Sequence, residues 1–400
     1  MASLPELACV TKLSPYVTRI LGQNPSKFTL QGTNSYLVHH PASPSLLLVD
    51  TTGPSSSAPF PTTAEQTYLT NLRSAILAHP AQPARVTDII LTHWHKDHVG
   101  AVGSVLRMLA ELHEGKGEAD EGVRVWKWPC ETSRGWAREE GVGNDLEQQL
   151  SGLRDGQVSS SQGGRVRPLQ TGQLFSLAPS SPSIDTSSTS DKVLELEIVP
   201  TPGHTSDSIC LALGLVPTSS SPAEQSAPSD FTSARSSSPP SRFLALFTAD
   251  TILGHGTAVF ASLSQYLKSL SKLVDLLKKE TNEGEAVLYP GHGEVIQEGL
   301  QKVEDYKRHR EEREEQVMKA LKGIEGGKSV SVDMLVDRIY GTSIPESLKL
   351  AARQGLLLHL AKLEEEGRVK RAGAMAVRTD NAGEGGEGST AVSDEEWEWV

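Results

Sequence analysis

The feature that most restricts the fold of this 400-residue chain is a histidine-rich run placed directly after a short apolar segment. Val86–Leu91 has the length and composition of a buried strand, and Thr-His-Trp-His-Lys-Asp-His follows it at once. In α/β proteins, sites gather at the carboxyl ends of strands, where this run would lie. Alternate side chains of extended backbone point the same way, so His93 and His95 can reach one cation. The turn that follows would let Asp97 and His98 face a neighbouring cation.

Three further polar residues each come just after an apolar run of strand length. They are His204, Asp250 and His292. Taken alone, each has an ordinary explanation, such as a loop histidine or a helix cap. Together with the first run they place histidines and aspartates at four successive strand ends, which is the ligand set of a two-metal hydrolase. Imidazole and carboxylate ligands suit zinc, with iron and manganese as alternatives.

Strands and helices alternate through most of the chain, which predicts a layered α/β domain. The expected strands are Leu46–Val49, Val86–Leu91, Val123–Trp128, Val193–Val199, Ile209–Leu215, Phe243–Phe247 and Ala286–Tyr289. Apolar residues at helical spacing predict helices within 62–77, 99–109 and 263–277. The remainder, with expected helices at 300–324, 331–340 and 345–366 and a short strand at 368–371, has the outline of a small winged-helix unit.

Three stretches interrupt this order, at residues 153–164, 178–191 and 217–241. They are rich in serine, glycine or proline and have no apolar periodicity. Such a composition cannot bury enough apolar surface to offset the entropy of the chain, so we expect disordered loop insertions. The acidic, glycine-rich end, residues 372–400, is expected to be a disordered tail.

Composition excludes several classes of protein. No window approaches 18 uninterrupted apolar residues, so no membrane span is expected. Three separated cysteines exclude a disulfide scaffold. The first residues lack the apolar core of a secretion signal, which favours a cytoplasmic protein, or a mitochondrial one with a weakly supported transit peptide. Half of the formal charge of −12 comes from the tail, so net charge says little about the partners of the body.

The order of Asp50, the His-x-His-x-Asp-His run, His204, Asp250 and His292 resembles the metallo-β-lactamase superfamily. Segments 21–25, 29–37, 252–257 and 355–364 are similar to the lactamase-beta-like protein 2 family. The resemblance covers residues 10–371 without the three insertions. It implies an α/β fold, an αββα sandwich over 1–298, a helical winged-helix-like domain over 299–371 and the tail 372–400.

Two departures from the family pattern are small. Residues 50–53 read Asp-Thr-Thr-Gly, with one threonine more than usual, and Ala101 replaces a common glycine. Both could shift the loops near the metals without removing a ligand.

The resemblance implies two zinc ions per chain. One would be held by His93, His95 and His204, the other by Asp97, His98 and His292, with Asp250 bridging them. The ions would lower the pKa of a shared water so that it attacks as hydroxide. The same resemblance gives Asp97 a second role in orienting that nucleophile. It places Asp50 behind the ligands, where it fixes a histidine or the following loop.

Weaker candidates concern the substrate. Thr33, Asn34 and His255 are candidates for the mouth of the site, although turn chemistry explains them equally well. Trp126 and Trp128 share one face of a strand and could stack on bases, but core packing is the better interpretation. Six cations of the last domain could contact phosphates, although a solvated helical face explains them better: Lys349, Arg353, Lys362, Arg368, Lys370 and Arg371.

Three functions remain open at this point. Family members include endoribonucleases that cut single-stranded RNA and fungal thioesterases that release polyketides from carrier proteins, so either a phosphodiester or an acyl thioester could be the substrate. A winged-helix binding protein with a vestigial metal site is the third. The complete ligand set disfavours the third, and we expect single-stranded RNA as the partner, with neither membrane nor DNA. Oligomeric state is not predicted.

Overall fold

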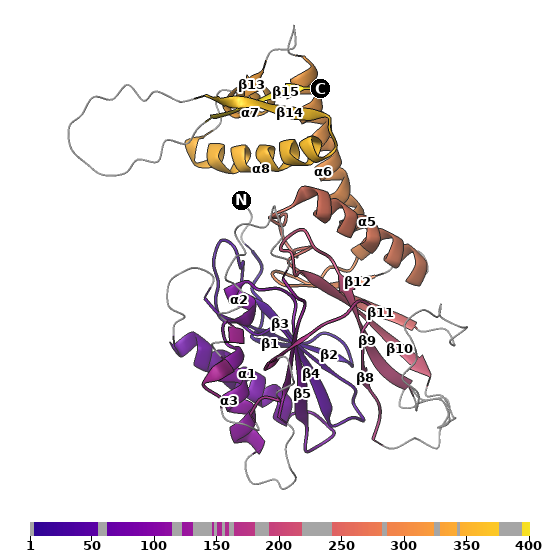
Figure 1. Cartoon of the computed structure of the whole chain (residues 1–400). Coiled ribbons are helices and arrows are strands. Elements are labelled where there is room, and N and C mark those ends of the chain that lie inside the picture. Colours follow the sequence, from indigo (N-terminus) through magenta and orange to yellow (C-terminus); the bar gives the residue numbers. More distant parts are fainter. Residues whose placement is uncertain are drawn as a thin grey trace, which may run out of the picture.

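The computed structural model describes residues 4–54, 62–113, 122–130, 146–147, 150–153, 157–159, 164–180, 192–217, 242–281, 286–323, 329–341, 345–375 and 394–400. The helices are α1 (Thr62–Leu77), α2 (Lys96–Val99), α3 (Val102–His113), α5 (Leu263–Glu280), α6 (Gly299–Lys322), α7 (Val332–Tyr340) and α8 (Glu346–Glu365). Figure 1 shows a large body and a smaller C-terminal unit, with α6 running from one to the other.

Two sheets form the body. The strands of the first, in spatial order, are β1 (Val10–Lys12), β2 (Val17–Leu21), β3 (Asn34–His39), β4 (Ser45–Val49), β5 (Arg85–Leu91), β6 (Arg124–Lys127) and β7 (Val166–Pro168). Those of the second are β12 (Val287–Pro290), β11 (Arg242–Ala249), β10 (Ile209–Pro217), β9 (Lys192–Pro200) and β8 (Leu174–Leu177). Strands β4 to β7 pair in parallel, as do β11 and β12.

Three apolar cores separate four layers. Helices α1 and α3 cover the outer face of the first sheet, where Tyr68 and Leu106 belong to the same apolar core as Leu48. Side chains of both sheets meet in the middle core, and α5 and the first half of α6 cover the outer face of the second sheet. This order of layers confirms the expected αββα sandwich. Two-sided burial explains the unbroken apolar strands that were recognisable in the sequence.

The strand directions bring the candidate residues to one edge. Asp50 and the His93 run follow β4 and β5, which are parallel neighbours. In the second sheet β10 is antiparallel to both β9 and β11, so the ends of β9, β11 and β12 also share one edge. A backbone hydrogen bond from Ile209 N to Thr92 O joins the two sheets beside this edge. The loops that carry the candidate ligands therefore meet.

The C-terminal unit combines α7 and α8 with a small sheet of β13 (Val330–Ser331), β15 (Asp394–Trp399) and β14 (Val369–Met375). Its helices agree with the expected ones to within a residue or two. The expected disorder of the tail 372–400 is wrong at both ends, because β14 extends to Met375 and residues 394–399 form β15. Residues 376–393 lie outside the described residues.

The reason for β15 is its two tryptophans. Trp397 is completely buried in the core of the C-terminal unit, and Trp399 packs against the same core. Residues two apart in a strand share a face, so Glu396 and Glu398, which alternate with the tryptophans, point away from the core. Glu396 accepts a hydrogen bond from Ser329 Oγ, and Glu398 pairs with Lys370.

The expected insertions fall mostly outside the described residues. Within 153–164, Leu153 and Val158 are buried in the outer core, so this stretch contacts the body at those two points. Within 178–191 only 178–180 are described, and of 217–241 only Pro217. Among the described residues, no helix is long and apolar enough to cross a membrane.

Candidate metal centre

The loop after β5 is held in place by Asp50. The Asp50 carboxylate accepts hydrogen bonds from Thr92 N and Thr92 Oγ1, both at 2.7 Å. Its Oδ2 also lies 2.8 Å from His98 Nδ1. The backbone of Asp50 adopts a φ of +57°, a left-handed conformation that few residues other than glycine take up. Asp50 therefore lies behind the candidate ligand His98, on the Nδ1 side of its ring.

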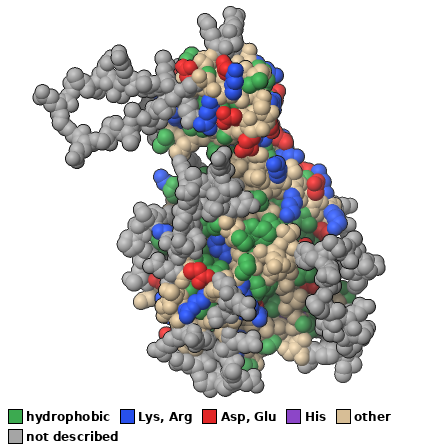
Figure 2. Space-filling model, in the orientation of Figure 1, with side chains coloured by type: hydrophobic (Ala, Val, Ile, Leu, Met, Phe, Trp, Pro, Cys, Tyr) green, Lys and Arg blue, Asp and Glu red, His purple; other side chains and the backbone are tan. Residues whose placement is uncertain are grey.

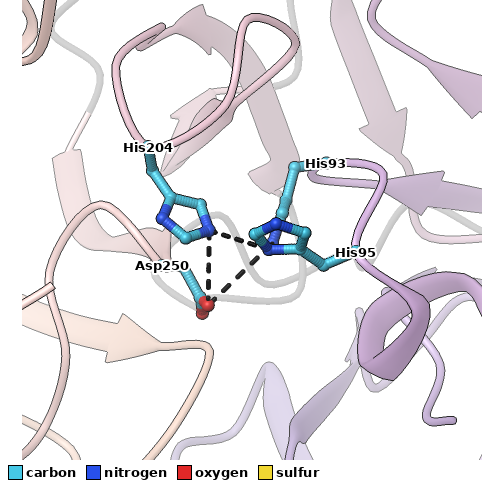
Figure 3. Close-up of side chains that lie close together, drawn as sticks. All are labelled: His93, His95, His204 and Asp250. Atoms are coloured by element: carbon cyan, nitrogen blue, oxygen red, sulfur yellow. Dashed lines mark hydrogen bonds and ion pairs between the residues drawn. The ribbon is translucent and has the colours of Figure 1, made fainter. Parts of the chain in front are cut away.

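The first group of metal-ligating atoms comes from three loops. His93, His95, His204 and Asp250 each offer one atom, and these atoms lie within 4.8 Å of one another (Figure 3). His95 Nδ1 lies 3.0 Å from the Nε2 atoms of both His93 and His204. A single ring nitrogen cannot make a full hydrogen bond to both, whereas a cation between the three rings takes a lone pair from each. The donor set therefore fits a metal ion.

The second group consists of Asp97, His98 and His292. Asp97 Oδ2 lies 3.2 Å from His292 Nε2 and 3.5 Å from His98 Nε2. Asp97 and His98 are neighbours on the short helix α2, which starts just after His95 and turns them away from the first group. His98 and His292 are almost fully buried, so their ring nitrogens face the site and not solvent.

Asp250 lies between the two groups and presents one oxygen to each. Its Oδ1 is 3.4 Å from the Nε2 atoms of His98 and His292. Its Oδ2 is 3.6 Å from His204 Nε2 and 3.9 Å from His93 Nε2. Oδ1 is buried and has no hydrogen-bond partner among the described residues. An unpartnered carboxylate oxygen costs free energy in a protein interior unless a cation satisfies it.

Most of these histidine rings are held by a contact on Nδ1, the ring nitrogen that faces away from the centre of the site. His204 Nδ1 lies 2.6 Å from Val259 O, and His292 Nδ1 lies 3.4 Å from Gly32 O. With the Asp50 contact of His98, three rings present Nε2 to the centre. Metal-binding histidines are typically held in this manner, because the outer hydrogen bond fixes both the tautomer and the ring orientation.

The two groups differ in their electrostatics. Burial lowers the pKa of His93, with further lowering by His98 and His95, and burial and His204 lower the pKa of His95 to about 3. Both rings are therefore neutral near pH 7, the form in which imidazole binds metals.

Carboxylates dominate around the second group. Burial alone would lower the pKa of His292, but Asp250 and Asp97 outweigh it and raise the value to about 9. His98 behaves in the same way, since burial is outweighed by Asp97, Asp250 and Asp50, and its pKa lies well above the usual value. The site thus has a strongly negative potential that attracts cations.

Glycines allow the loops to approach this closely, a requirement that sequence analysis missed. A Cβ on Gly291 would lie 2.3 Å from Asp250 Oδ1 and 3.0 Å from His98 Cε1. Gly203 has a φ of +145°, and a Cβ there would collide with the backbone of Tyr266. The Pro-Gly-His sequences before His204 and His292 were the available signal.

A buried ion pair behind the His204 turn was also missed. Lys127, at the end of β6, contacts the Asp207 carboxylate, and Asp207 accepts a hydrogen bond from Thr205 Oγ1 at 2.7 Å. Burial lowers the pKa of Lys127, but Asp207 and Cys130 more than compensate and raise it. Nothing in the spacing of these residues indicated that they meet.

The expected substrate residues do not all face the site. Thr33 and Asn34 are buried beside His292, and their side chains hold other loops. Thr33 Oγ1 accepts from Asn24 Nδ2, and Asn34 Nδ2 donates to Pro290 O and Gly293 O. Neither faces an open surface, whereas His255 is exposed.

The structure favours core packing for the two tryptophans, and ion pairing for the cations of the C-terminal unit, over contact with a nucleic acid. Trp126 and Trp128 pack against the middle core. Five of the six candidate phosphate-binding cations have carboxylate partners, and four of these pairs are Lys362–Glu314, Arg353–Asp333, Lys370–Glu398 and Arg371–Glu364. Arg368 lies 3.3 Å from Glu366. These pairs neutralise the face that would have contacted a nucleic acid.

Two family models match the chain. The metallo-beta-lactamase superfamily matches residues 28–216, and the beta-lactamase associated winged helix domain matches residues 331–378. With the αββα layers and the His/Asp cluster, the chain belongs to the metallo-beta-lactamase superfamily, a class of metal-binding hydrolases.

More specific relatives cover almost the whole chain. The beta-lactamase-like protein 2 homolog of Drosophila melanogaster is 30% identical over 92% of this chain and 94% of its own length. The atrochrysone carboxyl ACP thioesterase of Passalora fulva is 29% identical over 92% of this chain and 81% of its own. A beta-lactamase domain protein from Burkholderia ambifaria has the same fold, with a TM-score of 0.51 at 19% identity over 92% of this chain and 93% of its own.

Proposed function

We propose that the chain is a hydrolase that binds two zinc ions. His93, His95 and His204 would hold one ion, and Asp97, His98 and His292 the other. The observation that carries this proposal is the position of Asp250, which presents one oxygen to each group at 3.4–3.9 Å from the histidine nitrogens. A carboxylate placed between two complete ligand groups is typical of a bridging ligand.

The residues of the chain prepare the chemistry in distinct ways. Zinc, when bound, lowers the pKa of a water molecule and polarises the bond to be cut. Asp97 has its carboxylate at the edge of the site, 15% exposed, and can hold the water and take up its proton. Asp50 keeps the His98 ring in place. Burial of the histidines excludes bulk water from the centre, which strengthens every charge interaction there.

For the substrate we propose single-stranded RNA. A site with two ligand groups suits a phosphodiester, because metal ions held there would offset the negative charge that develops when the linkage is cut. The Drosophila relative matches this chain nearly end to end, and the resemblance to the lactamase-beta-like protein 2 family implies endoribonuclease activity. The paired cations of the C-terminal unit offer no support, so the contacts to RNA would have to come from the body.

An acyl thioester on a carrier protein is the second candidate. The observation that favours it is the Passalora fulva relative, named as an acyl carrier protein thioesterase, which aligns with 92% of this chain. Both reactions would use the same metal centre, so the ligands do not separate them.

A parallel assay decides between the two. Zinc-loaded protein is offered a labelled single-stranded RNA, the matching duplex and an acyl-carrier thioester, each with and without EDTA. We expect EDTA-sensitive cleavage of the single strand in preference to the duplex. Asp97→Ala should reduce it by at least about a hundredfold, the usual contribution of a positioned acid or base. Asp275→Ala, an exposed aspartate on α5, is the matched control and should leave the rate unchanged.

Each outcome has a definite meaning. Thioester turnover without RNA cleavage would replace the first candidate by the second. RNA cleavage that persists in Asp97→Ala would point to a contaminating nuclease. Protein that binds no zinc by elemental analysis would refute the hydrolase proposal itself.

A further inference from the structure

A concave site separate from the metal centre lies beside the loop that follows Asp250. It is a cavity of about 330 Å³ between Gly256 and Thr257 of that loop and one face of α6. Its charged lining consists of Lys302, Asp305, Arg308, His309, Arg310 and Glu312. Figure 2 shows Lys and Arg side chains over the region that α5 and α6 occupy.

The positive charges in this cavity are not balanced by its acids. Arg308 contacts both acidic side chains, Asp305 and Glu312, and so neutralises much of their charge. Lys302 and Arg310 have no carboxylate partner within ion-pair distance among the described residues. The Lys302 ammonium lies instead over the ring of Tyr306, 5.3 Å from the ring centre.

Arg310 is unusual because it is half-buried and only partly satisfied. One of its terminal nitrogens, Nη2, donates to Ala258 O at 2.9 Å, and the guanidinium lies 4.8 Å from the centre of the Phe260 ring. Its Nε is buried without a hydrogen-bond partner among the described residues. A buried cation without an anion is costly, and such groups are usually paired.

The surrounding titratable groups report the same positive potential. Burial lowers the pKa of His309, and Arg310 and Arg313 lower it further. On α8, burial together with the same two arginines lowers the pKa of His359 to about 3. Cations of α6 thus gather at this point, and an anion would relieve their mutual repulsion.

The cavity is connected to the metal centre through the loop. Arg310 holds Ala258 O, and the next carbonyl, Val259 O, lies 2.6 Å from Nδ1 of His204. Tyr306 Oη donates to Gly256 O at 2.9 Å. At the other end of the loop, Gly254 N donates to His292 O. A bound substrate strand that extends from the metal centre across this loop would reach α6.

We propose that this cavity binds a phosphate group of the RNA strand outside the linkage that is cut. Lys302 and the Nε of Arg310 would supply charge-assisted hydrogen bonds, and the side chain of His309 would supply a third donor. The inference rests on the proposed function for the choice of RNA, but the existence of an anion site here can be tested without any turnover.

The test follows the backbone amide of Thr257 by NMR in zinc-loaded protein labelled with ¹⁵N-threonine. A Thr257→Ser variant assigns the signal. Inorganic phosphate and a non-cleavable 2′-O-methyl RNA hexamer are titrated separately. We expect saturable shifts with both probes, and for the hexamer a dissociation constant about tenfold weaker in Lys302→Gln, the size expected for loss of one charge-assisted contact. The slope of its logarithm against log salt should also fall by about 0.7.

Lys307→Gln is the matched control, because it makes the same change on the same helix at a residue that pairs with Glu311 and does not line the cavity. It should bind both probes as the unchanged protein does. Absence of a saturable shift with phosphate, or equal effects of the two variants, would overturn the anion site. A phosphate shift without a hexamer shift would overturn its assignment to RNA. The turnover assay plays no part in these readings, so failure of the proposed function is recognised separately.

Discussion

At the scale of single residues, the metal centre depends on groups that do not themselves face it. Asp50 binds the backbone and side chain of Thr92 and the Nδ1 side of His98, so one carboxylate sets the start of the histidine loop and the orientation of a ring at its end. Its left-handed backbone would be strained in isolation, and these hydrogen bonds compensate for that strain. The negative charge also favours a fixed tautomer of His98.

Asp50→Asn tests this role directly. The amide has the same shape but cannot accept all three hydrogen bonds, so His98 loses its fixed orientation. We expect the zinc affinity to fall by about 10- to 100-fold, the usual effect of losing such a partner. Titration against a chromogenic chelator measures it, with Asp275→Asn as the control. Unchanged zinc affinity in Asp50→Asn would show that the remaining contacts hold the ring without the charge.

At the scale of elements, the chain presents short loops from parallel strands at one edge and supports them with helices. Helix α6 contributes to two cores, since Val303 and Tyr306 pack under the second sheet and Val317 and Leu321 pack in the C-terminal unit. The boundary expected at 298/299 therefore falls at the start of a helix shared by both units. We retain the division into a body and a C-terminal domain as a proposal, with α6 as their common element.

Strand β15 gives the prediction at this scale. Trp397 is fully buried between β14 and the helices of the C-terminal unit. Trp397→Ala should destabilise that unit by about 3–5 kcal/mol, the range for truncating a large buried aromatic side chain. Denaturant unfolding followed by circular dichroism measures the loss, while zinc binding should be retained, because no candidate ligand belongs to this unit. Val400→Ala, at an exposed position, is the control. Equal stability of the two variants would mean that the strand is dispensable.

At the scale of the whole molecule, the sequence predicted those features that depend on local pattern. Buried strands, amphipathic helices and the ligands at strand ends are encoded within a few residues each, and the structure brings all seven candidate ligands together. Features made by distant residues were not predictable. The pairing of Lys127 with Asp207 joins the ends of two sheets. Trp397 is buried only because the acidic segment 394–399 forms β15, which pairs with β13 and β14. The contacts of Asn34 were not predictable either, because Pro290 and Gly293 lie far along the chain.

The connection between β10 and β11 allows a prediction about the whole chain. The two strands are antiparallel neighbours, and Leu215 pairs with Arg242, so the ends that residues 218–241 join already lie side by side. Antiparallel strands need only two to five residues to connect them. Replacing residues 218–241 by a short Gly-Ser linker should therefore leave the fold and the zinc content unchanged. Shortening a loop several-fold alters the closure entropy by only about 1–2 kcal/mol, and in the stabilising direction. Thermal unfolding and elemental analysis measure both quantities. A melting temperature several degrees lower, or loss of zinc, would show that the replaced segment packs against the body.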